Sequence, residues 1–218
     1  MSVDTQAAVT WILGQGGAVK VSTDAGLVNV STIESLPANS AIVSIVLTST
    51  SVVRIPEAIL VASADLTNLS LSGTEVGDDC MADICMLKSL KSLYLSGTMV
   101  SDRGVQSVAK MTALDALDLS DTTVTDASLP YIALLERLVY LDLSRTKVVG
   151  SDLNCLHGLR ILAHLDLSHS CVTEHFLSRM VDLGFFHRDR IPLEIDLVGI
   201  EVSSALLTQL QDLCTVVI

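Results

Sequence analysis

A leucine pattern recurs along most of this chain with a fixed period. The last residue of each Leu-x-Leu pair, or of its Ile-x-Leu equivalent, lies at Leu47, Leu71, Leu95, Leu119, Leu143 and Leu167, in steps of 24 residues. A seventh copy ends at Leu197, 30 residues later. A period in the twenties is typical of a solenoid, in which each repeat is one structural unit stacked on the next. Because a solenoid mainly displays a long surface, function must be sought in the residues at its display positions.

Each repeat contains one strand pattern and one helix pattern. Leu-x-Leu alternates with period two, which suits a strand with one buried face. The second half of the repeat carries apolar residues three apart, as on one stripe of a short helix. These stripes are Val105, Val108 and Met111; Leu129, Ile132 and Leu135; Leu153, Leu156 and Leu159; and Leu177, Met180 and Leu183. Asp102, Asp126 and Glu174 fall just before the helices, where we expect them to cap free N–H groups.

The repeat frame, L-x-x-L-x-L-x-x-T-x-V, resembles that of the leucine-rich repeat family from about Ala41 to Ile218. The resemblance implies an α/β fold: a right-handed solenoid with a concave parallel sheet and short helices on the convex side. The V-S-D and V-T-D segments at 100–102 and 124–126 resemble the cysteine-containing subclass found beside F-box domains. No F-box is visible here, so the role of that subclass as a substrate receptor does not transfer.

The sequence departs from the family at one buried position, where the family has Asn or Cys. Here that position holds Thr50, Thr74, Thr98, Thr122, Thr146, Ser170 and Ile200. In the family this residue hydrogen-bonds the turn backbone of neighbouring repeats. A hydroxyl has the donor and acceptors to do the same, and we expect such a ladder until Ile200, which has no polar atom in its side chain.

The regular repeats begin near residue 41. We interpret residues 1–40 as an N-terminal cap and 41–218 as a solenoid of seven repeats, together one domain, because a solenoid exposes its core at each end. A helix is predicted from Val3 to Leu13, with Trp11 packed over the first coil, and a strand near Val28–Val30. The six-residue expansion falls within 184–192. Its Phe185 and Phe186 either contact a partner or tuck under the coil.

Composition narrows the possible partners and compartments. The net charge of −12 disfavours nucleic acid, and it fits a basic protein partner or simple solubility. The five cysteines lie at inequivalent repeat positions, which indicates free thiols in a reducing compartment. The first residues lack a basic signal-peptide region, and no run of 18 apolar residues occurs. We therefore expect a cytoplasmic protein without a membrane role.

The residues between the buried leucines should point outward on the sheet. They are, in order, Val46, Ser70, Tyr94, Asp118, Asp142, Asp166 and Asp196, followed two residues later by Thr48, Ser72, Ser96, Ser120, Ser144, Ser168 and Val198. Neighbouring carboxylates about 5 Å apart repel by roughly 0.8 kcal/mol in water. We hypothesise that this column accepts lysine or arginine side chains of a partner, or Ca²⁺. The alternative is that aspartate merely suits this slot in solenoids.

Three further outward residues are candidate contacts. Tyr94, Tyr140 and His164 are predicted on neighbouring positions of the concave sheet, where a tyrosine makes a good anchor. The cluster of His164, His169, Cys171, Glu174 and His175 does not converge as a zinc site requires. No nucleophile elbow, zinc-protease motif or phosphate loop occurs.

The sequence therefore predicts a protein-interaction module with no metal, cofactor or enzymatic activity. The alternative is a structural subunit held permanently in a cytoskeletal or ribonucleoprotein assembly.

Overall fold

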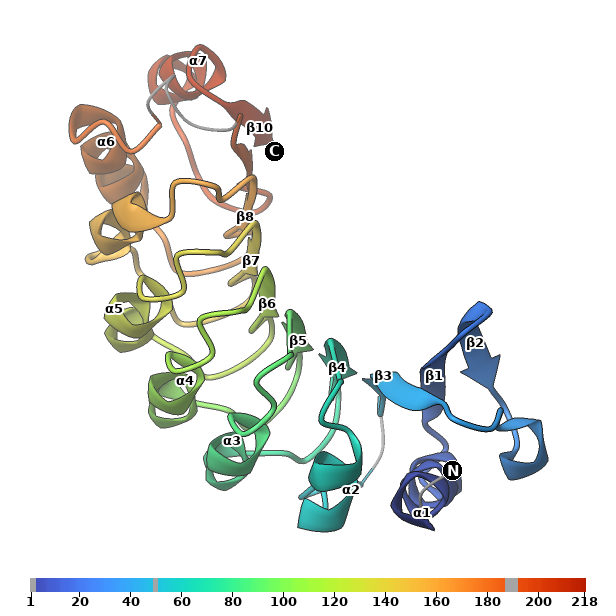
Figure 1. The fold of residues 1–218 in the computed structure, drawn as a ribbon. Coiled ribbons are helices and arrows are strands. Elements are labelled where there is room, and N and C mark those ends of the chain that lie inside the picture. Colours follow the sequence, from blue (N-terminus) through green and yellow to red (C-terminus); the bar gives the residue numbers. More distant parts are fainter. Residues whose placement is uncertain (1–2, 49–50, 187–191) are drawn as a thin grey trace.

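The chain forms a curved solenoid in a computed structural model that describes residues 3–48, 51–186 and 192–218 (Figure 1). One ten-stranded sheet lines the inner side, in the order β10-β9-β8-β7-β6-β5-β4-β3-β1-β2. The helices lie along the outer side (Figure 1). The predicted α/β solenoid with a concave, mostly parallel sheet is therefore confirmed.

The parallel strands are short and keep one register from coil to coil. They are β3 (Ala41–Val46), β4 (Asn68–Ser70), β5 (Ser92–Tyr94), β6 (Ala116–Asp118), β7 (Tyr140–Asp142), β8 (His164–Asp166), β9 (Glu194–Asp196) and β10 (Thr215–Val217). The central residue of each of β4 to β8 is a buried leucine, and in β9 it is Ile195. The longer sixth repeat does not shift this register, because Leu165 still faces Ile195.

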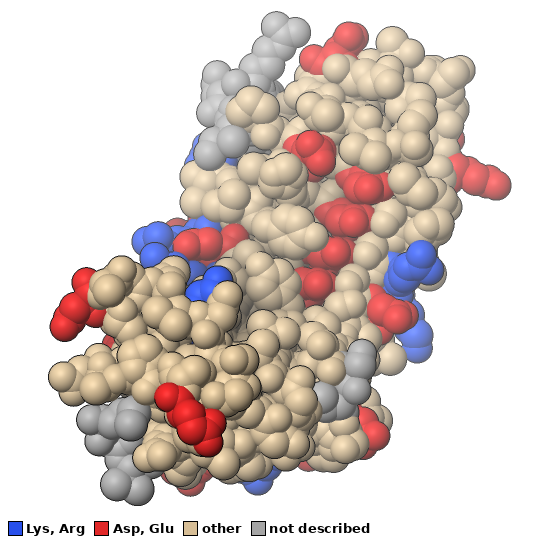
Figure 2. Space-filling view, turned by 90° about the vertical axis from the view of Figure 1, so that its right-hand side faces the viewer, with Lys and Arg blue, Asp and Glu red and all other residues tan. Residues whose placement is uncertain are grey.

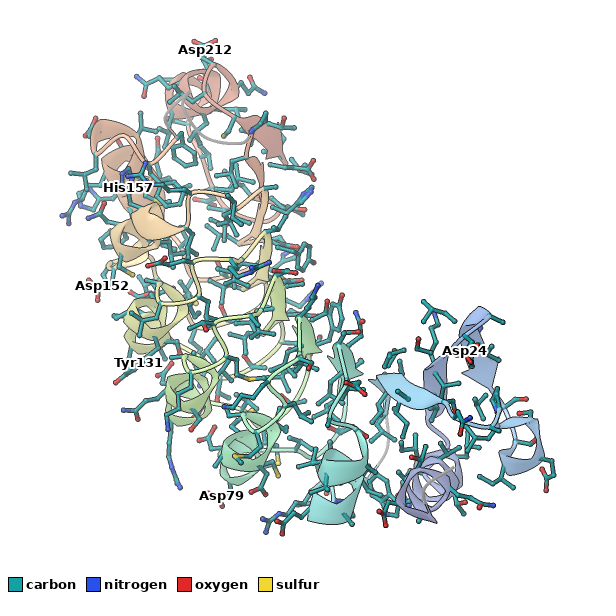
Figure 3. All side chains as sticks on the ribbon, in the orientation of Figure 1. Asp24, Asp79, Tyr131, Asp152, His157 and Asp212 are labelled. Carbon is teal, nitrogen blue, oxygen red and sulfur yellow. The ribbon has the colours of Figure 1, made fainter. Side chains whose placement is uncertain are left out.

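The outer helices vary more than the strands. They are α2 (Glu57–Ala62), α3 (Asp78–Ile84), α4 (Asp102–Val108), η2 (Asp126–Ser128), α5 (Leu129–Ile132), η3 (Leu153–Gly158), α6 (Glu174–Asp182) and α7 (Ser204–Gln211). The predicted apolar stripes are buried, except that Leu183 is 49% exposed. Side chains fill the space between sheet and helices. Asp79 and Asp152 lie on the outer side of the solenoid and point outward into solvent (Figure 3).

The N-terminal segment adds a helix and an antiparallel hairpin. It comprises α1 (Val3–Gly14), β1 (Ala18–Thr23), β2 (Gly26–Val30) and η1 (Ile33–Ser35). β1 pairs with both β2 and β3 in antiparallel fashion, and Trp11 is partly buried against the core. The predicted helix and the strand near Val28 are confirmed, and the role as a cap stays a prediction. The hairpin stands at an angle beside the concave side (Figure 1).

The buried threonines bond within their own turn. The hydroxyls of Thr74, Thr98, Thr122 and Thr146 donate to the carbonyl oxygen three residues earlier, at 2.5–2.6 Å. The expected side-chain ladder between repeats is therefore wrong at these four positions, and Thr50 lies outside the described residues. A hydroxyl on a short side chain reaches the nearest carbonyl, which lies in the same turn. The backbone makes the contact between repeats instead, as where Gly97 N–H donates to Ser120 O at 2.9 Å.

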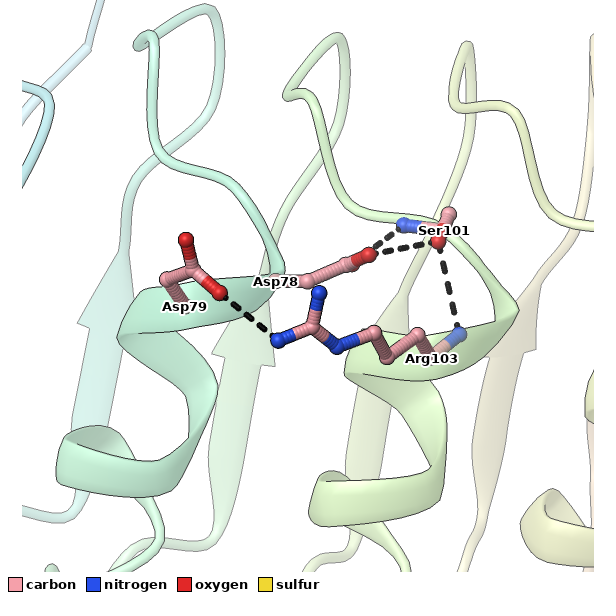
Figure 4. A network of polar contacts seen from close by, with 4 residues as sticks. All are labelled: Asp78, Asp79, Ser101 and Arg103. Atoms are coloured by element: carbon pink, nitrogen blue, oxygen red, sulfur yellow. Dashed lines mark hydrogen bonds and ion pairs between the residues drawn. The ribbon is translucent and has the colours of Figure 1, made fainter.

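Carboxylates at the helix starts join one coil to the next. Asp78 accepts hydrogen bonds from Ser101 N at 2.8 Å and Ser101 Oγ at 2.6 Å (Figure 4). Asp102 accepts from Thr125 N and Oγ1, both at 2.8 Å. We call Asp78, Asp102 and Asp126 the acidic staples. Asp102 and Asp126 were expected to cap their own helices, and that expectation is wrong because Ser101 and Thr125 occupy the cap positions.

Asp126 makes the most extensive staple. Its carboxylate accepts from the backbone N–H groups of Val149, Gly150 and Ser151 at 2.9–3.0 Å, and from Ser151 Oγ. Burial favours a higher pKa for this carboxyl, but these hydrogen bonds outweigh it and lower the pKa below its usual value. One repeat later the position is Gly150, so the series is interrupted there. Glu174, also expected to cap its own helix, instead accepts from Ser203 Oγ in the next coil.

Candidate functional site: the concave face

Four aspartates form one row across the concave face. Tyr94, Asp118, Asp142, Asp166 and Asp196 are successive Cα partners in the parallel ladder. We call Asp118, Asp142, Asp166 and Asp196 the acidic file. Figure 2 shows acidic side chains in a file along this face. The predicted single file is therefore present, because the regular repeat length brings the same slot to the same place in each coil.

Each aspartate of the acidic file also has a local structural role. Its Oδ1 accepts the backbone N–H two residues later at 2.8–2.9 Å, from Ser120, Ser144, Ser168 and Val198 respectively. This Asx turn ends the strand and starts the loop. The following residue, such as Asp121, Arg145 or His169, has a φ of 53–55°. Aspartate therefore suits the turn, while its negative charge remains on the face.

The aspartates of the acidic file form no ion pair with the residues that the structure describes. The ion pairs found there join Arg54–Asp83, Arg103–Asp79, Arg137–Asp115 and His164–Glu194. Asp142, in the middle of the file, is 8% exposed. Burial raises the pKa of its carboxyl, hydrogen bonds from Ser144 oppose this, and the charges of Asp118 and Asp166 raise it further. The centre of the face therefore favours any group that neutralises negative charge.

A second row beside the acidic file carries Tyr140, His164 and Glu194 as successive partners. The rings of Tyr140 and His164 lie 6.2 Å apart, and His164 Nδ1 lies 3.6 Å from Glu194 Oε1. Tyr140 OH donates to Asp142 Oδ2 at 3.3 Å, and burial together with nearby aspartates raises the pKa of its phenol. Tyr94 lies at the head of the acidic file, next to Asp118, as the order of outward residues predicts, and not in the row of Tyr140 and His164.

The phenylalanines of the expanded repeat do not lie on the surface. Phe185 is 0% and Phe186 3% exposed, and their ring centroids are 5.1 Å apart in an edge-on arrangement. The expectation that they bind a partner is corrected in favour of the alternative, in which they tuck under the coil. The longer repeat leaves space that two large side chains fill. The rest of the predicted loop, residues 187–191, lies outside the described residues.

A hollow at the N-terminal end of the face was not predicted. It has a volume of about 480 Å³ and lies where the hairpin meets the concave strands. Its lining includes Lys20, Leu27, Val46, Asn68 and Tyr94. The missed signal was a second strand before the regular repeats. The apolar alternation of Val19 and Val21, with the turn at 24–25, indicates a hairpin with Val28 and Val30.

Residues 3–48, 51–186 and 192–218 contain no group of three or more His, Cys, Asp or Glu side chains arranged to hold a metal ion. None of the helices in these ranges combines the length and apolar character needed to cross a bilayer.

Comparison with known proteins supports the fold. Neither protein-family models nor curated proteins match the sequence. The structure is similar to an internalin C2 from Listeria monocytogenes, with a TM-score of 0.58 and 22% identity, covering 81% of this chain and 79% of that one. It is also similar to a plant ice-binding protein, with a TM-score of 0.54 and 22% identity, covering 77% of this chain and 53% of that one. The leucine-rich repeat ectodomain of a receptor kinase from Arabidopsis thaliana gives a TM-score of 0.48 at 22% identity, covering 80% and 18%.

Proposed function

We propose that this chain, which has the leucine-rich repeat fold, is a non-enzymatic module that binds a basic segment of another protein along its concave face. The observation that carries the proposal is the acidic file, four aspartates in register that form no ion pair with the described residues. Strands about 4.8 Å apart bring the carboxylates close enough to repel. Lysine or arginine side chains would relieve that repulsion and add charge-assisted hydrogen bonds.

The local geometry favours binding over chemistry. One oxygen of each carboxylate is held by its own turn, so the side chains are already oriented. Orientation before binding lowers the entropic cost of a contact. Tyr140 and His164 flank the acidic file and supply contact area for a partner's side chains. The open face does not enclose a reacting group away from water, as catalysis by carboxylates usually requires.

Cysteine chemistry and net charge support the compartment and the class of partner that we propose. The described cysteines are all free thiols, which fits the reducing cytoplasm that we propose for this protein. The acidic surface disfavours direct binding to nucleic acid. A protein partner with a lysine- or arginine-rich segment fits best.

The proposal is tested by removing the charge and keeping the turn. Asp118, Asp142 and Asp166 are changed together to Asn, which retains an oxygen at Oδ1 and nearly the same volume. The partner is first captured by proximity labelling in the native cell, and its affinity for the purified chain is then measured by calorimetry. We expect binding to weaken by roughly threefold to a hundredfold, because three charge contacts of about 0.2–1 kcal/mol each add up to about 0.6–3 kcal/mol.

A second triple variant provides the matched control. Asp79, Asp152 and Asp212 are exposed, lie away from the concave face and change the net charge equally when replaced by Asn (Figure 3). This variant should keep full affinity. Equal binding by both triple variants and the parent chain would contradict a role for the acidic file.

The second candidate is a structural subunit held permanently in an assembly. The expanded repeat offers it no exposed phenylalanine as a contact, because Phe185 and Phe186 are in the core. Size-exclusion chromatography separates the two functions. A monomer of 23.2 kDa fits the module, and obligate association fits the subunit.

A further inference from the structure

We propose that the N-terminal hollow is the apolar subsite of the same groove. It takes one aromatic or long aliphatic side chain of an extended partner segment, whose basic residues lie on the acidic file. This inference rests on the proposed function, because both subsites must be filled by one segment. An apolar contact in the hollow would fix the position and the orientation of the bound segment, which charge contacts alone would not.

The hollow is built by five adjacent strands. Lys20 and Ser22 come from β1, Leu27 from β2, Val46 from β3, Asn68 from β4 and Tyr94 from β5. The sheet changes from parallel to antiparallel at β3, which pairs in parallel with β4 and antiparallel with β1, and the β1–β3 pairing has a register shift between Lys20 and Val21. The hairpin stands at an angle beside the concave strands (Figure 1), and its residues Lys20, Ser22 and Leu27 line the hollow. Its volume of about 480 Å³ is of the size that holds a large side chain.

The wall of the hollow presents apolar surface to solvent. Leu27 is 67% exposed although it faces this space from β2. Val43, Val46 and Tyr94 are half-buried and line the same space. Apolar surface removed from water stabilises a complex by about 25 cal/mol per Å². An apolar side chain of a partner would cover these groups, whereas the serine and asparagine side chains at the rim stay hydrated or bond the partner's backbone.

Charge fixes which end of the segment lies here. Among the described residues that line the hollow, Lys20 is the charged one, and neither Asp nor Glu contributes. A lysine or arginine of the partner would be repelled at this end and attracted further along the face, at Asp142. The two ends of the groove therefore differ in character: the end at β1–β3 is apolar, and the end at β6–β9 is anionic.

The two subsites are continuous and their spacing fits an extended chain. Val46, Ser70, Tyr94 and Asp118 are successive partners, so Tyr94 belongs to the hollow and also adjoins the acidic file. Four aspartates span three strand steps, about 14 Å at about 4.8 Å each. An extended segment covers that length in about four residues, with same-side residues nearly 7 Å apart. Three basic residues at alternate positions would therefore match the file, with the apolar anchor a few residues away.

Selection from a random library of twelve-residue peptides displayed on phage tests this inference on the full chain. We expect enriched peptides to carry an aromatic or long aliphatic residue and, at a fixed separation, lysine or arginine at alternate positions. A synthetic consensus peptide is then measured against Leu27→Ser, which removes exposed apolar surface without disturbing the core. Binding should weaken about tenfold, and a peptide lacking the anchor should bind the parent chain and Leu27→Ser equally.

The matched control is Val61→Ser on α2, since Val61 is 70% exposed on the outer side. It should bind the consensus peptide as the parent chain does. Enriched peptides with basic residues but no apolar anchor, or unchanged affinity in Leu27→Ser, would overturn the subsite and leave the proposed function standing. Enrichment of peptides without basic residues, or of none at all, would overturn both.

Discussion

Two sets of aspartates recur with the same period in this molecule, and they differ in what their carboxylates contact. The acidic staples at the helix starts accept hydrogen bonds from the next coil, as Asp78 does from Ser101. The acidic file on the concave face bonds backbone in its own turn, as Asp166 does with Ser168 N–H. Position in the coil therefore decides whether the same side chain holds coils together or displays charge. Loss of a staple should weaken the fold, whereas loss of charge from the file should weaken binding alone.

The largest effect on stability is expected at Asp126. Asp126→Ala removes the acceptor of three backbone N–H groups and one hydroxyl, so we expect a loss of about 2–3 kcal/mol in the free energy of unfolding. The lowered pKa of this carboxyl in the folded chain gives the effect a pH dependence. The stabilisation is present above the unfolded carboxyl pKa of about 3.9 and is lost as pH falls through the folded pKa.

Urea denaturation at pH 7 and at lower pH measures both parts of this prediction. Asp152→Ala is the control, because Asp152 is exposed in the next repeat and no hydrogen bond to its carboxylate is found among the described residues. It should unfold like the parent chain. Equal destabilisation of the Asp126 variant at every pH would show that the carboxylate charge is not the cause.

A sharper comparison uses two consecutive residues. Asp78 bonds the backbone and hydroxyl of Ser101, whereas Asp79 pairs with the exposed guanidinium of Arg103 at 2.9 Å (Figure 4). Asp78→Ala should lose about 2 kcal/mol of unfolding free energy. Asp79→Ala should change it by less than about 0.5 kcal/mol, because surface ion pairs contribute little. Thermal or urea unfolding of the two variants decides the point, and equal losses would remove the distinction between staple and surface pair.

Gly104 supplies an independent reason to believe the staple at Asp78. A Cβ added at Gly104 would lie 2.5 Å from Asp78 Oδ1 and 2.9 Å from Val100 Cγ1. Glycine inside a helix lowers stability by about 0.5–1 kcal/mol relative to alanine, so its presence here calls for a structural reason. The reason is that a larger side chain would occupy the space in which the Asp78 carboxylate reaches the next coil.

The acidic file could be predicted from the sequence because it depends only on periodicity. When every repeat has 24 residues, Asp118, Asp142 and Asp166 must occupy equivalent places, and the buried leucines fix which side they face. The staples could not be predicted in the same way. Capping rules consider a residue and its own helix, whereas the bond from Asp102 to Thr125 joins residues 23 apart in sequence. That contact depends on the separation of coils in space.

Irregular parts of the chain set the other limit to sequence reasoning. The hollow depends on the antiparallel pairing of β1 with β3, which interrupts the repeat that made the rest predictable. The expanded repeat left two placements open for Phe185 and Phe186. Only the space beneath the coil decides between them, and there the N–H of Phe185 donates to Met180 O while its ring lies 6.4 Å from that of His157.

The smallest change in the free energy of unfolding is expected at Asp142, and it should be a gain in stability where the other variants lose stability. Burial and the charges of Asp118 and Asp166 raise the pKa of this carboxyl, although Ser144 opposes the shift. A raised folded pKa means that the charged form destabilises the fold at neutral pH, and that this cost disappears as pH falls below the unfolded carboxyl value. Asp142→Asn keeps the acceptor for Ser144 N–H, so unfolding at pH 7 should require up to about 1 kcal/mol more. At low pH the two proteins should be equally stable, and a loss at pH 7 would mean that the fold itself needs the charge.

Asp142→Ala separates charge from turn geometry, because it removes the acceptor as well and should destabilise the chain at every pH. A gain from Asn together with a loss from Ala would show that the turn requires an oxygen but no charge, so that another constraint, such as a basic partner, must account for aspartate in this slot.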